Sequence, residues 1–316
     1  MSLHVVIGAG PVGTATARLL AARGDHVRIV TRSGSGPEHP NIDRITADAT
    51  DPRALLAHCA GAAALYQCAQ PAYHRWPQDF PPLHHAILTV AERSGAPLIT
   101  VGNLYAYGEF DGPVSESHPL HPNSAKGRVR ADLWSEQLAA HRSDRIRTAE
   151  VRGSDYLGPA ATSAFTVMVW PAVLAGKRAL VPADLDAPHS WTATEDVARL
   201  LVAVADDETA WGRAWHVPTA PPLSVRALAD LTASVAGAPP ARVGRMPAAL
   251  LWTAGLFLRD AREMRELRYQ FDRPFVLDSS AATTHFALRP TPLEETLRAM
   301  LADHPGSALG TTAEVL

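Results

Sequence analysis

The first part of the chain that decides its fold is "LHVVIGAGPVGTATARLLAARGD", residues 3–25. Its opening residues form a short apolar run, which predicts a buried strand, and its second half places apolar residues at helical spacing and ends at Gly24. Between the two lies "GAGPVG", residues 8–13, a G-x-G-x-x-G match at the turn from strand to helix. This context predicts the first βα unit of a dinucleotide-binding fold.

Each glycine of this turn has a predicted role. Gly8 permits the tight turn, Gly10 lets the backbone approach a pyrophosphate, and Gly13 lets the helix pack closely. The helix N-terminus, with Pro11 and Val12 in its first turn, would face the phosphates. A purely structural glycine turn is the alternative interpretation.

The end of the second predicted strand indicates which dinucleotide binds. The sequence there is "IVTRSG", residues 29–34, which offers Thr31, Arg32 and Ser33 and no carboxylate. A carboxylate would bond the ribose 2′-hydroxyl and repel a 2′-phosphate, whereas a guanidinium can pair with phosphate oxygens. We therefore predict NADP(H), with a solvated surface arginine as the alternative.

Further cofactor contacts are predicted after the later strands. Asp48, in "ADATD" after the third strand, could reach the adenine amino group or could simply cap a helix. The remaining predicted cofactor residues are Ala49, Ala69, Lys126 and Ser154.

The first half of the chain alternates short β-branched runs with helical patterns, which predicts βαβ units and a parallel sheet. The fold class is therefore α/β, a Rossmann doubly wound parallel sheet with a smaller C-terminal substrate lobe. We expect an NADP-binding domain over residues 1–155, a substrate lobe over 156–305 that interleaves with the end of the sheet, and a C-terminal tail over 306–316. One long helix, or two, is expected over 247–271.

Composition excludes several other classes. The 316 residues are 47% hydrophobic and 19% charged with a net charge of −3, which provides no cationic surface for nucleic acid. The longest apolar run, residues 247–258, is too short to cross a membrane, and two cysteines favour a reducing, cytoplasmic location. Histidines lack a supporting ligand cluster, so no metal site is expected, and neither a nucleophile elbow nor a P-loop occurs.

Three further stretches, "LYAYGEFDGPVSESHP" (104–119), "RGSDYLGP" (152–159) and "TEDVARLLV" (194–202), complete a family pattern. With the glycine turn they make the chain resemble the extended short-chain dehydrogenase/reductase superfamily, in its NAD(P)-dependent epimerase/dehydratase branch, to about residue 300. The resemblance implies a C-terminal lobe that closes over a small-molecule substrate at the nicotinamide end. A homodimer is common in that family.

The resemblance also implies a catalytic Ser or Thr, a Tyr, and a Lys four residues after the Tyr. Here Asn103 stands in the Ser/Thr place, Lys126 matches the lysine, and Pro122 stands where the tyrosine would be. We predict a site rebuilt from Asn103, Tyr105 and Lys126, in which Tyr105 supplies the missing phenol. The alternatives are a tyrosine that packs between lobes and a solvated lysine at a helix start.

Substrate contacts are predicted from aromatic residues near the expected cleft. "QPAYHRW", residues 70–76, would place Tyr73 and Trp76 over the cleft mouth, although such clusters are often ordinary packing. Tyr105 and Tyr156 are the other predicted substrate residues. The function predicted first is an NADP(H)-dependent oxidoreductase acting on a carbonyl or hydroxyl group; the alternatives are a sugar-type epimerase or dehydratase with a resident cofactor, and a non-catalytic NADP(H)-sensing regulator.

Overall fold

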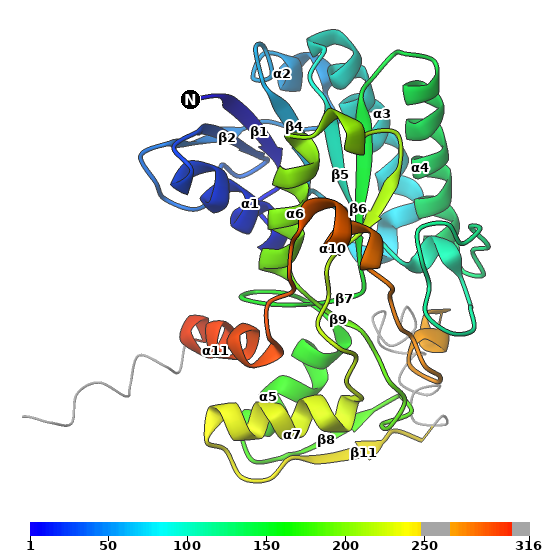
Figure 1. The fold of residues 1–316 in the computed structure, drawn as a ribbon. Coiled ribbons are helices and arrows are strands. Elements are labelled where there is room, and N and C mark those ends of the chain that lie inside the picture. Colours follow the sequence, from blue (N-terminus) through cyan, green and yellow to red (C-terminus); the bar gives the residue numbers. More distant parts are fainter. Residues whose placement is uncertain (248–265, 305–316) are drawn as a thin grey trace, which may run out of the picture.

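Seven parallel strands form the central sheet of the computed structural model, which describes residues 1–247 and 266–304 (Figure 1). The strand order is β10-β6-β5-β4-β1-β2-β3, so the chain winds outward from β1 in both directions. The strands are β1 (Leu3–Ile7), β2 (His26–Thr31), β3 (Ile42–Thr46), β4 (Ala64–Gln67), β5 (Leu98–Asn103), β6 (Thr148–Gly153) and β10 (Ala214–His216). The predicted doubly wound Rossmann sheet is confirmed.

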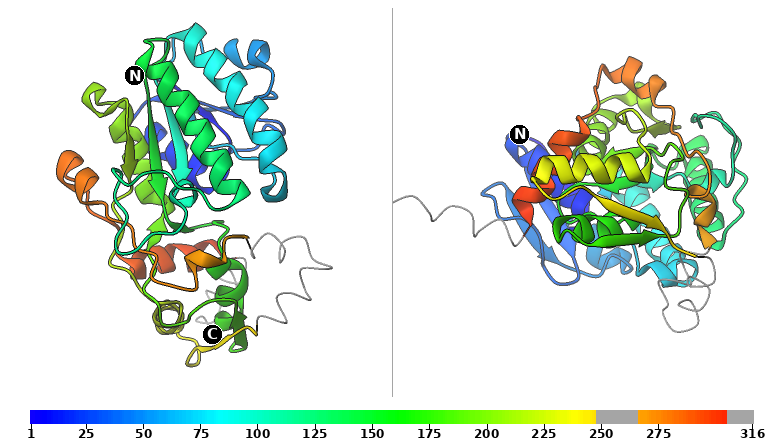
Figure 2. Two further views of the ribbon diagram at one scale, coloured as in Figure 1. Left: turned by 90° about the vertical axis from the view of Figure 1, so that its right-hand side faces the viewer. Right: turned by 90° about the horizontal axis from the view of Figure 1, so that it is seen from below.

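Helices cover both faces of this sheet. α1 (Pro11–Ala22) and α6 (Thr194–Ala205) pack together on one face, and α3 (Trp76–Ser94) and α4 (Ala125–Arg142) pack on the other, beside the short α2 (Pro52–Leu56) (Figures 1 and 2). The residues of strand β1 are apolar because both of its faces are buried. Val6 faces the α1–α6 layer and Val5 faces the α3 layer, and both are 0% exposed. A strand buried on both faces needs a continuous apolar run.

The helical spacing of apolar residues in "LHHAILTVAERSG", residues 83–95, predicts a helix there, but the helix begins earlier. α3 starts at Trp76, directly after the 3₁₀ turn η1 (Tyr73–Arg75), and includes Pro81 and Pro82. Prolines inside a helix favour a break or a kink in it. Here Trp76 and Phe80, each 2% exposed, anchor the first turns of α3 in the core. Burial therefore outweighs the local preference here.

The C-terminal lobe lies below the sheet in Figure 1. Two small parallel sheets organise it: β7 (Asp155–Leu157) pairs with β9 (Trp191–Ala193), and β8 (Arg178–Val181) pairs with β11 (Arg242–Arg245). Its helical segments are the π-helical turn η3 (Phe165–Val169), α5 (Trp170–Leu174), α7 (Val225–Ala236), η5 (Arg268–Gln270) and α11 (Leu293–Asp303). They enclose a separate apolar core that includes Phe165, Trp191 and Leu228.

The two parts alternate along the chain. After β7 the chain enters the lobe. It then returns to the central sheet as α6, η4 (Glu208–Ala210) and β10, and after a second passage through the lobe it returns as α10 (Ser280–Phe286), which packs on β10. The helix expected over 247–271 falls mostly outside the described residues, and so does the tail expected over 306–316. None of the helices in the described ranges is long and apolar enough to cross a membrane.

Candidate active site

A cleft opens where the strand order reverses, between β1 and its neighbours β2 and β4. Its volume is about 840 Å³, and it runs along the carboxyl ends of these strands. Predicted cofactor residues that line it are Gly8, Gly10, Pro11, Val12, Thr31, Arg32, Ser33, Asp48, Ala49 and Ala69. Four separate segments thus converge on one cavity, as a dinucleotide site requires.

The three glycines of the first turn meet different surroundings. Gly8 has φ +102°, and a Cβ there would lie 2.6 Å from the backbone nitrogen of Ala69. A Cβ at Gly13 would lie 2.0 Å from the carbonyl oxygen of Gly8, so α1 could not approach the loop. At Gly10, the N-cap of α1, a Cβ would meet no protein atom within 4 Å. Gly8 and Gly13 are therefore required by the protein itself, whereas the space at Gly10 opens into the cleft.

The end of β2 forms one wall of the cleft and is polar. Arg32 and Ser33 are exposed, and Thr31 Oγ1 donates a hydrogen bond to the Ser35 carbonyl oxygen over 3.2 Å. Asp48, opposite, accepts hydrogen bonds from the backbone nitrogen and the hydroxyl of Thr50 at 2.9 and 2.8 Å. These bonds, with a smaller contribution from Arg32, hold the pKa of Asp48 below its usual value. One Asp48 oxygen thus caps its own turn rather than α2, which Asp51 caps.

Arg75 and Asp79 line the cleft as well, although sequence reasoning missed them. The Arg75 guanidinium donates two hydrogen bonds to the Asp79 carboxylate at 2.6 and 2.7 Å. An arginine and an aspartate four residues apart are a common helix pair, so the spacing was visible, but only the fold places the pair on the cleft wall.

Lys126 is deeply buried, and its ammonium is paired with a carboxylate. Its side chain is 2% exposed, Nζ lies 2.9 Å from Oε2 of Glu266, and its backbone nitrogen donates to Oε1 of Glu266 over 3.0 Å. Burial raises the pKa of the Glu266 carboxyl, but the hydrogen bonds and charge of Lys126 outweigh it, so the net shift is downward. Lys126 does not line the dinucleotide cleft. The alternative of a solvated helix-start lysine is wrong.

Pro122, which stands where the family's tyrosine would be, lies outside the helix that carries Lys126. Ser124 caps α4 through a hydrogen bond from the Gly127 nitrogen, so Pro122 precedes the helix. Two side chains four residues apart share a helix face only when both lie in the helix. Lys126 and Arg130 satisfy this condition, and both are buried. Arg130 donates to the Val101 carbonyl oxygen over 2.9 Å, and burial lowers its pKa.

The aromatic residues predicted from the sequence meet around Lys126. The Tyr73 hydroxyl donates to the Tyr105 hydroxyl over 3.2 Å, and the Lys126 ammonium lies 4.5 Å from the centre of the Tyr73 ring. Trp76 is also part of this group, with its ring centre 6.0 Å from that of Tyr105, but it is 2% exposed and its Nε1 donates to the Pro71 carbonyl oxygen. Trp76 is therefore a core residue, in place of the expected aromatic lid.

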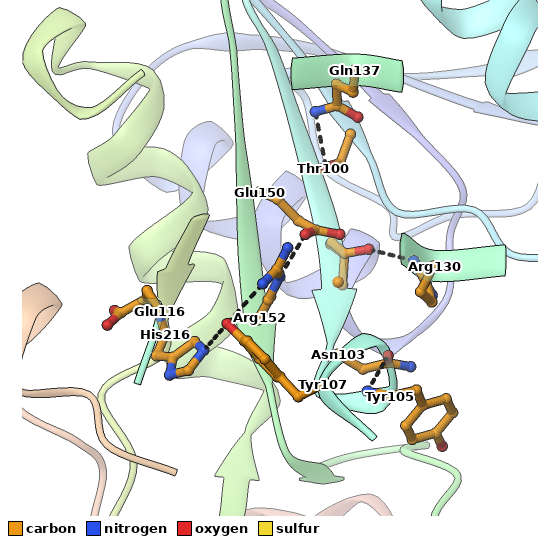
Figure 3. Close-up of polar contacts among 12 residues, drawn as sticks. Thr100, Asn103, Tyr105, Tyr107, Glu116, Arg130, Gln137, Glu150, Arg152 and His216 are labelled. Atoms are coloured by element: carbon orange, nitrogen blue, oxygen red, sulfur yellow. Dashed lines mark hydrogen bonds and ion pairs between the residues drawn. The ribbon is translucent and has the colours of Figure 1, made fainter. Parts of the chain in front are cut away.

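Asn103 ends strand β5 and shapes the loop that holds Tyr105. Its Oδ1 accepts a hydrogen bond from the Tyr105 backbone nitrogen over 3.1 Å, as Figure 3 shows. The side-chain NH2 group of Asn103 takes no part in this hydrogen bond. Burial, followed by the neighbouring Tyr73 and Asp155, raises the pKa of Tyr105 well above its ordinary value. Tyr105 is thus a poor proton donor in these surroundings.

Beyond β6, Tyr156 lines the cleft and its hydroxyl donates to the Gly102 carbonyl oxygen over 2.5 Å. Ser154, two residues before Tyr156, does not line the cleft and is 6% exposed. Its hydroxyl finds no hydrogen-bond partner among the described residues. Such an unpaired buried hydroxyl is costly unless a ligand uses it.

A chain of polar side chains supports the site from inside the sheet (Figure 3). Arg152 donates to Oε2 of Glu150 over 2.6 Å and to the Tyr107 hydroxyl over 2.7 Å. His216 bonds the Asp278 carbonyl oxygen through Nδ1 over 2.9 Å, so its Nε2 accepts from Tyr107 at 2.8 Å. Burial lowers the pKa of His216 to about 3. This network fixes Tyr107 as a structural residue.

Two more ionisable residues lie near the cluster without a signal in the sequence. His189 Nε2 lies 2.7 Å from Oδ2 of Asp155, and its ring stacks on Phe271 with centres 5.0 Å apart. Asp155, Tyr105 and Glu266 come from three distant segments, so no local pattern could have joined them. Among the described residues, no group of three or more His, Cys, Asp and Glu side chains could hold a metal ion.

The family model for the NAD dependent epimerase/dehydratase family matches residues 4–217. The chain belongs to this family. The match covers the glycine turn, the whole central sheet and the segments that carry Lys126 and Tyr105. No curated protein matches the chain.

Solved structures share the fold over nearly the whole chain. The dTDP-glucose 4,6-dehydratase DesIV from Streptomyces venezuelae, with NAD and DAU bound, is 20% identical with a TM-score of 0.76, covering 97% of this chain and 98% of its own. UDP-glucose 4-epimerase from Thermotoga maritima is 16% identical with a TM-score of 0.76, covering 95% and 98%. The WbmH enzyme of Bordetella bronchiseptica, in complex with NAD+, is 18% identical with a TM-score of 0.74, covering 96% and 98%.

Proposed function

We propose that this protein binds a nicotinamide dinucleotide in the cleft and transfers hydride to or from a carbon that carries a hydroxyl or carbonyl group. The space at Gly10 is the observation that carries the proposal. A Cβ at this N-cap would enter the cleft and meet no protein atom within 4 Å, so the glycine serves a ligand at the positive end of α1. When bound, the nicotinamide supplies the hydride chemistry.

The residues around Lys126 form the catalytic end of this site. The amide of Asn103 is placed to donate to a substrate oxygen, a phenol of the Tyr73–Tyr105 pair gives or takes the proton, and the Lys126 ammonium stabilises the charge that develops on it. The unpaired hydroxyl of Ser154 and the side chain of Tyr156 border the cofactor from β7 and the loop before it.

Two kinds of reaction use this chemistry, and the family favours one. Membership in the epimerase/dehydratase family and the likeness to sugar-nucleotide enzymes favour epimerisation or dehydration of a sugar-type substrate, in which the hydride leaves and returns. Net oxidoreduction is the second candidate, because exposed Arg32 and a cleft open along β2 permit the dinucleotide to exchange. A non-catalytic sensor would bind the dinucleotide and turn nothing over.

We further propose that NADP(H) is preferred over NAD(H), because Arg32 and Ser33 line the wall next to the expected 2′-position and no carboxylate follows β2. A charge-assisted contact with phosphate contributes about 1.5 to 3 kcal/mol, so NADPH should bind at least about tenfold more tightly than NADH. Calorimetric titration checks this: Arg32→Ala should remove most of the margin, and Arg53→Ala, an exposed arginine of α2 outside the cleft, should keep it. Equal affinity for both dinucleotides would contradict the preference.

The reaction class is tested by the fate of the dinucleotide. Protein incubated with UDP-glucose or dTDP-glucose and one equivalent of dinucleotide should convert many equivalents of sugar while the dinucleotide is retained. Stoichiometric loss of NADPH with a carbonyl substrate would instead favour net oxidoreduction. Binding of NADPH without any turnover would favour the sensor.

A further inference from the structure

Three side chains from three separate elements meet beside the part of the cleft wall that residues 70–72 form. Tyr73 comes from η1, Tyr105 from η2 (Tyr105–Tyr107) and Lys126 from the first turn of α4. We propose that Tyr73, and not Tyr105, is the proton donor and acceptor of the hydride-transfer reaction, with Lys126 stabilising its ionised form and Tyr105 positioning its hydroxyl. The proposal rests on the proposed function, since it names the acid of that same site.

The direction of the hydrogen bond between the phenols favours Tyr73. Tyr73 Oη donates to Tyr105 Oη, so an acceptor oxygen already lies beside the Tyr73 hydroxyl. Their separation of 3.2 Å is longer than the 2.7–2.8 Å typical of bonds between hydroxyl oxygens. A substrate carbonyl or hydroxyl oxygen can therefore replace Tyr105 as the acceptor at little cost.

The charges around the two phenols point the same way. The Lys126 ammonium, which also pairs with the Glu266 carboxylate at 2.9 Å, lies 4.5 Å from the centre of the Tyr73 ring. From there it stabilises the negative charge left when the phenol gives up its proton. Burial, followed by the neighbouring Tyr73 and the Asp155 carboxylate, raises the pKa of Tyr105 well above its ordinary value. Negative charge is thus favoured on Tyr73 and opposed on Tyr105.

The segment that carries Tyr73 borders the cleft. Its neighbours Ala72 and Arg75 line the dinucleotide cleft, as does Pro71, so η1 is part of the cleft wall. Tyr73 is partly exposed, and solvent can reach it to restore the proton. A phenol carried by this wall needs no tyrosine on α4, which accounts for Pro122.

The proposed step balances as follows in the direction of reduction. The carbonyl double bond opens, the carbon receives the hydride of a reduced nicotinamide dinucleotide, and the oxygen receives the proton of Tyr73. The dinucleotide is oxidised by two electrons, the substrate becomes an alcohol, and the Tyr73 phenolate takes a proton from water. In the reverse direction the phenolate accepts the alcohol proton.

Matched tyrosine variants test the assignment in the full chain. With NADPH and phenanthrenequinone as the probe substrate, Tyr73→Phe should lower turnover by about 100-fold or more, the usual scale for losing a general acid, and leave the NADPH dissociation constant within about twofold. Tyr105→Phe should lower turnover by less than about tenfold. Lys126→Met should lower turnover and shift the pH profile of the rate upward, since the phenolate loses its cation.

A second measurement keeps the assignment testable if the quinone is not reduced. In protein with carbon-labelled tyrosine rings, NMR titration should find that Tyr73 ionises at lower pH than Tyr105, and that Lys126→Met raises the ionisation of Tyr73 most. If Tyr105 ionises first, or if Tyr105→Phe abolishes turnover while Tyr73→Phe does not, the assignment is overturned. Failure of NADPH to bind the unmodified protein would instead refute the proposed function, independently of which tyrosine ionises first.

Discussion

The dinucleotide cleft and the cluster around Lys126 share one edge of the sheet but are made of different parts. The cleft is lined by backbone and short side chains from the ends of β1, β2, β3 and β4. The cluster is made of long side chains, Tyr73, Tyr105, Lys126 and Glu266, brought together from separate elements. A site of the first kind can be recognised from a short motif, whereas a site of the second kind exists only when the whole chain has folded.

Residues of the two regions also have different roles. Glycines in the cleft are needed either by the protein or by the ligand, and the two cases differ in geometry. In the Lys126 cluster each charged group is balanced by a partner that the fold supplies. A substitution that changes only stability or only dinucleotide affinity would support this difference between the two regions. A substitution that unexpectedly changes both would contradict it.

The largest effect is expected from a pair of glycine variants. Gly13→Ala places a methyl group 2.0 Å from the Gly8 carbonyl oxygen, so the loop and α1 must move apart, at a cost of about 2–4 kcal/mol in stability together with loss of dinucleotide binding. Gly10→Ala should fold with nearly unchanged stability, because its Cβ meets no protein atom within 4 Å, but should weaken dinucleotide binding at least about tenfold. Denaturant unfolding and titration with NADPH measure both. Tight binding by the Gly10 variant would show that this space does not hold the pyrophosphate.

A second effect concerns the acid sensitivity of the supporting network. Burial lowers the pKa of His216 to about 3, so the unfolded chain binds a proton on this residue at a pH where the folded chain does not. Stability should therefore fall as the pH drops below about 6.5, by about 2 kcal/mol between pH 6.5 and 5 from this residue. His216→Asn keeps a donor and an acceptor and should flatten this part of the profile. An unchanged slope in urea unfolding across this range would contradict the buried neutral imidazole.

The smallest effect is expected at the pair that joins Lys126 to the lobe. Glu266→Gln should cost about 1 kcal/mol at neutral pH, because the ammonium of Lys126 loses a carboxylate partner that is 25% exposed and therefore partly screened by solvent. The pKa of Glu266 is lowered in the folded protein, so its contribution is present above its unfolded pKa and disappears as the pH falls through the folded value. The difference from the unmodified protein should therefore shrink as the pH falls and vanish once the pH is below the lowered pKa of folded Glu266.

The exposed pair of Glu92 and Arg145 is the control for this substitution. Glu92→Gln should change stability by less than about 0.5 kcal/mol. Dinucleotide affinity should stay unchanged in both variants, because Lys126 does not line the cleft. A large loss of affinity in Glu266→Gln alone would mean that the two regions are coupled, which would break the comparison.

The sequence by itself determined the sheet and the glycine loop of this protein. Short apolar runs, helical spacing and the glycine turn are local features, and backbone geometry converts them into structure with little help from distant residues. Arg32 and Asp48 were placed on the cleft by the same local logic. The sequence left two partners open for Asp48, because a carboxylate near a turn can cap the turn as readily as reach a ligand, and the structure shows that it bonds Thr50 in its own turn.

Only the tertiary structure decided what surrounds Lys126. Its carboxylate partner stands 140 residues later in the chain, and the phenol over its ammonium comes from η1, a segment in which the sequence indicated an exposed aromatic lid. Trp76 shows the same limit. Because its side chain is buried, α3 begins at this residue and continues through Pro81 and Pro82, where the sequence favours no helix. These contacts depend on how distant elements pack, and packing sums over many weak interactions that no short pattern of residues contains.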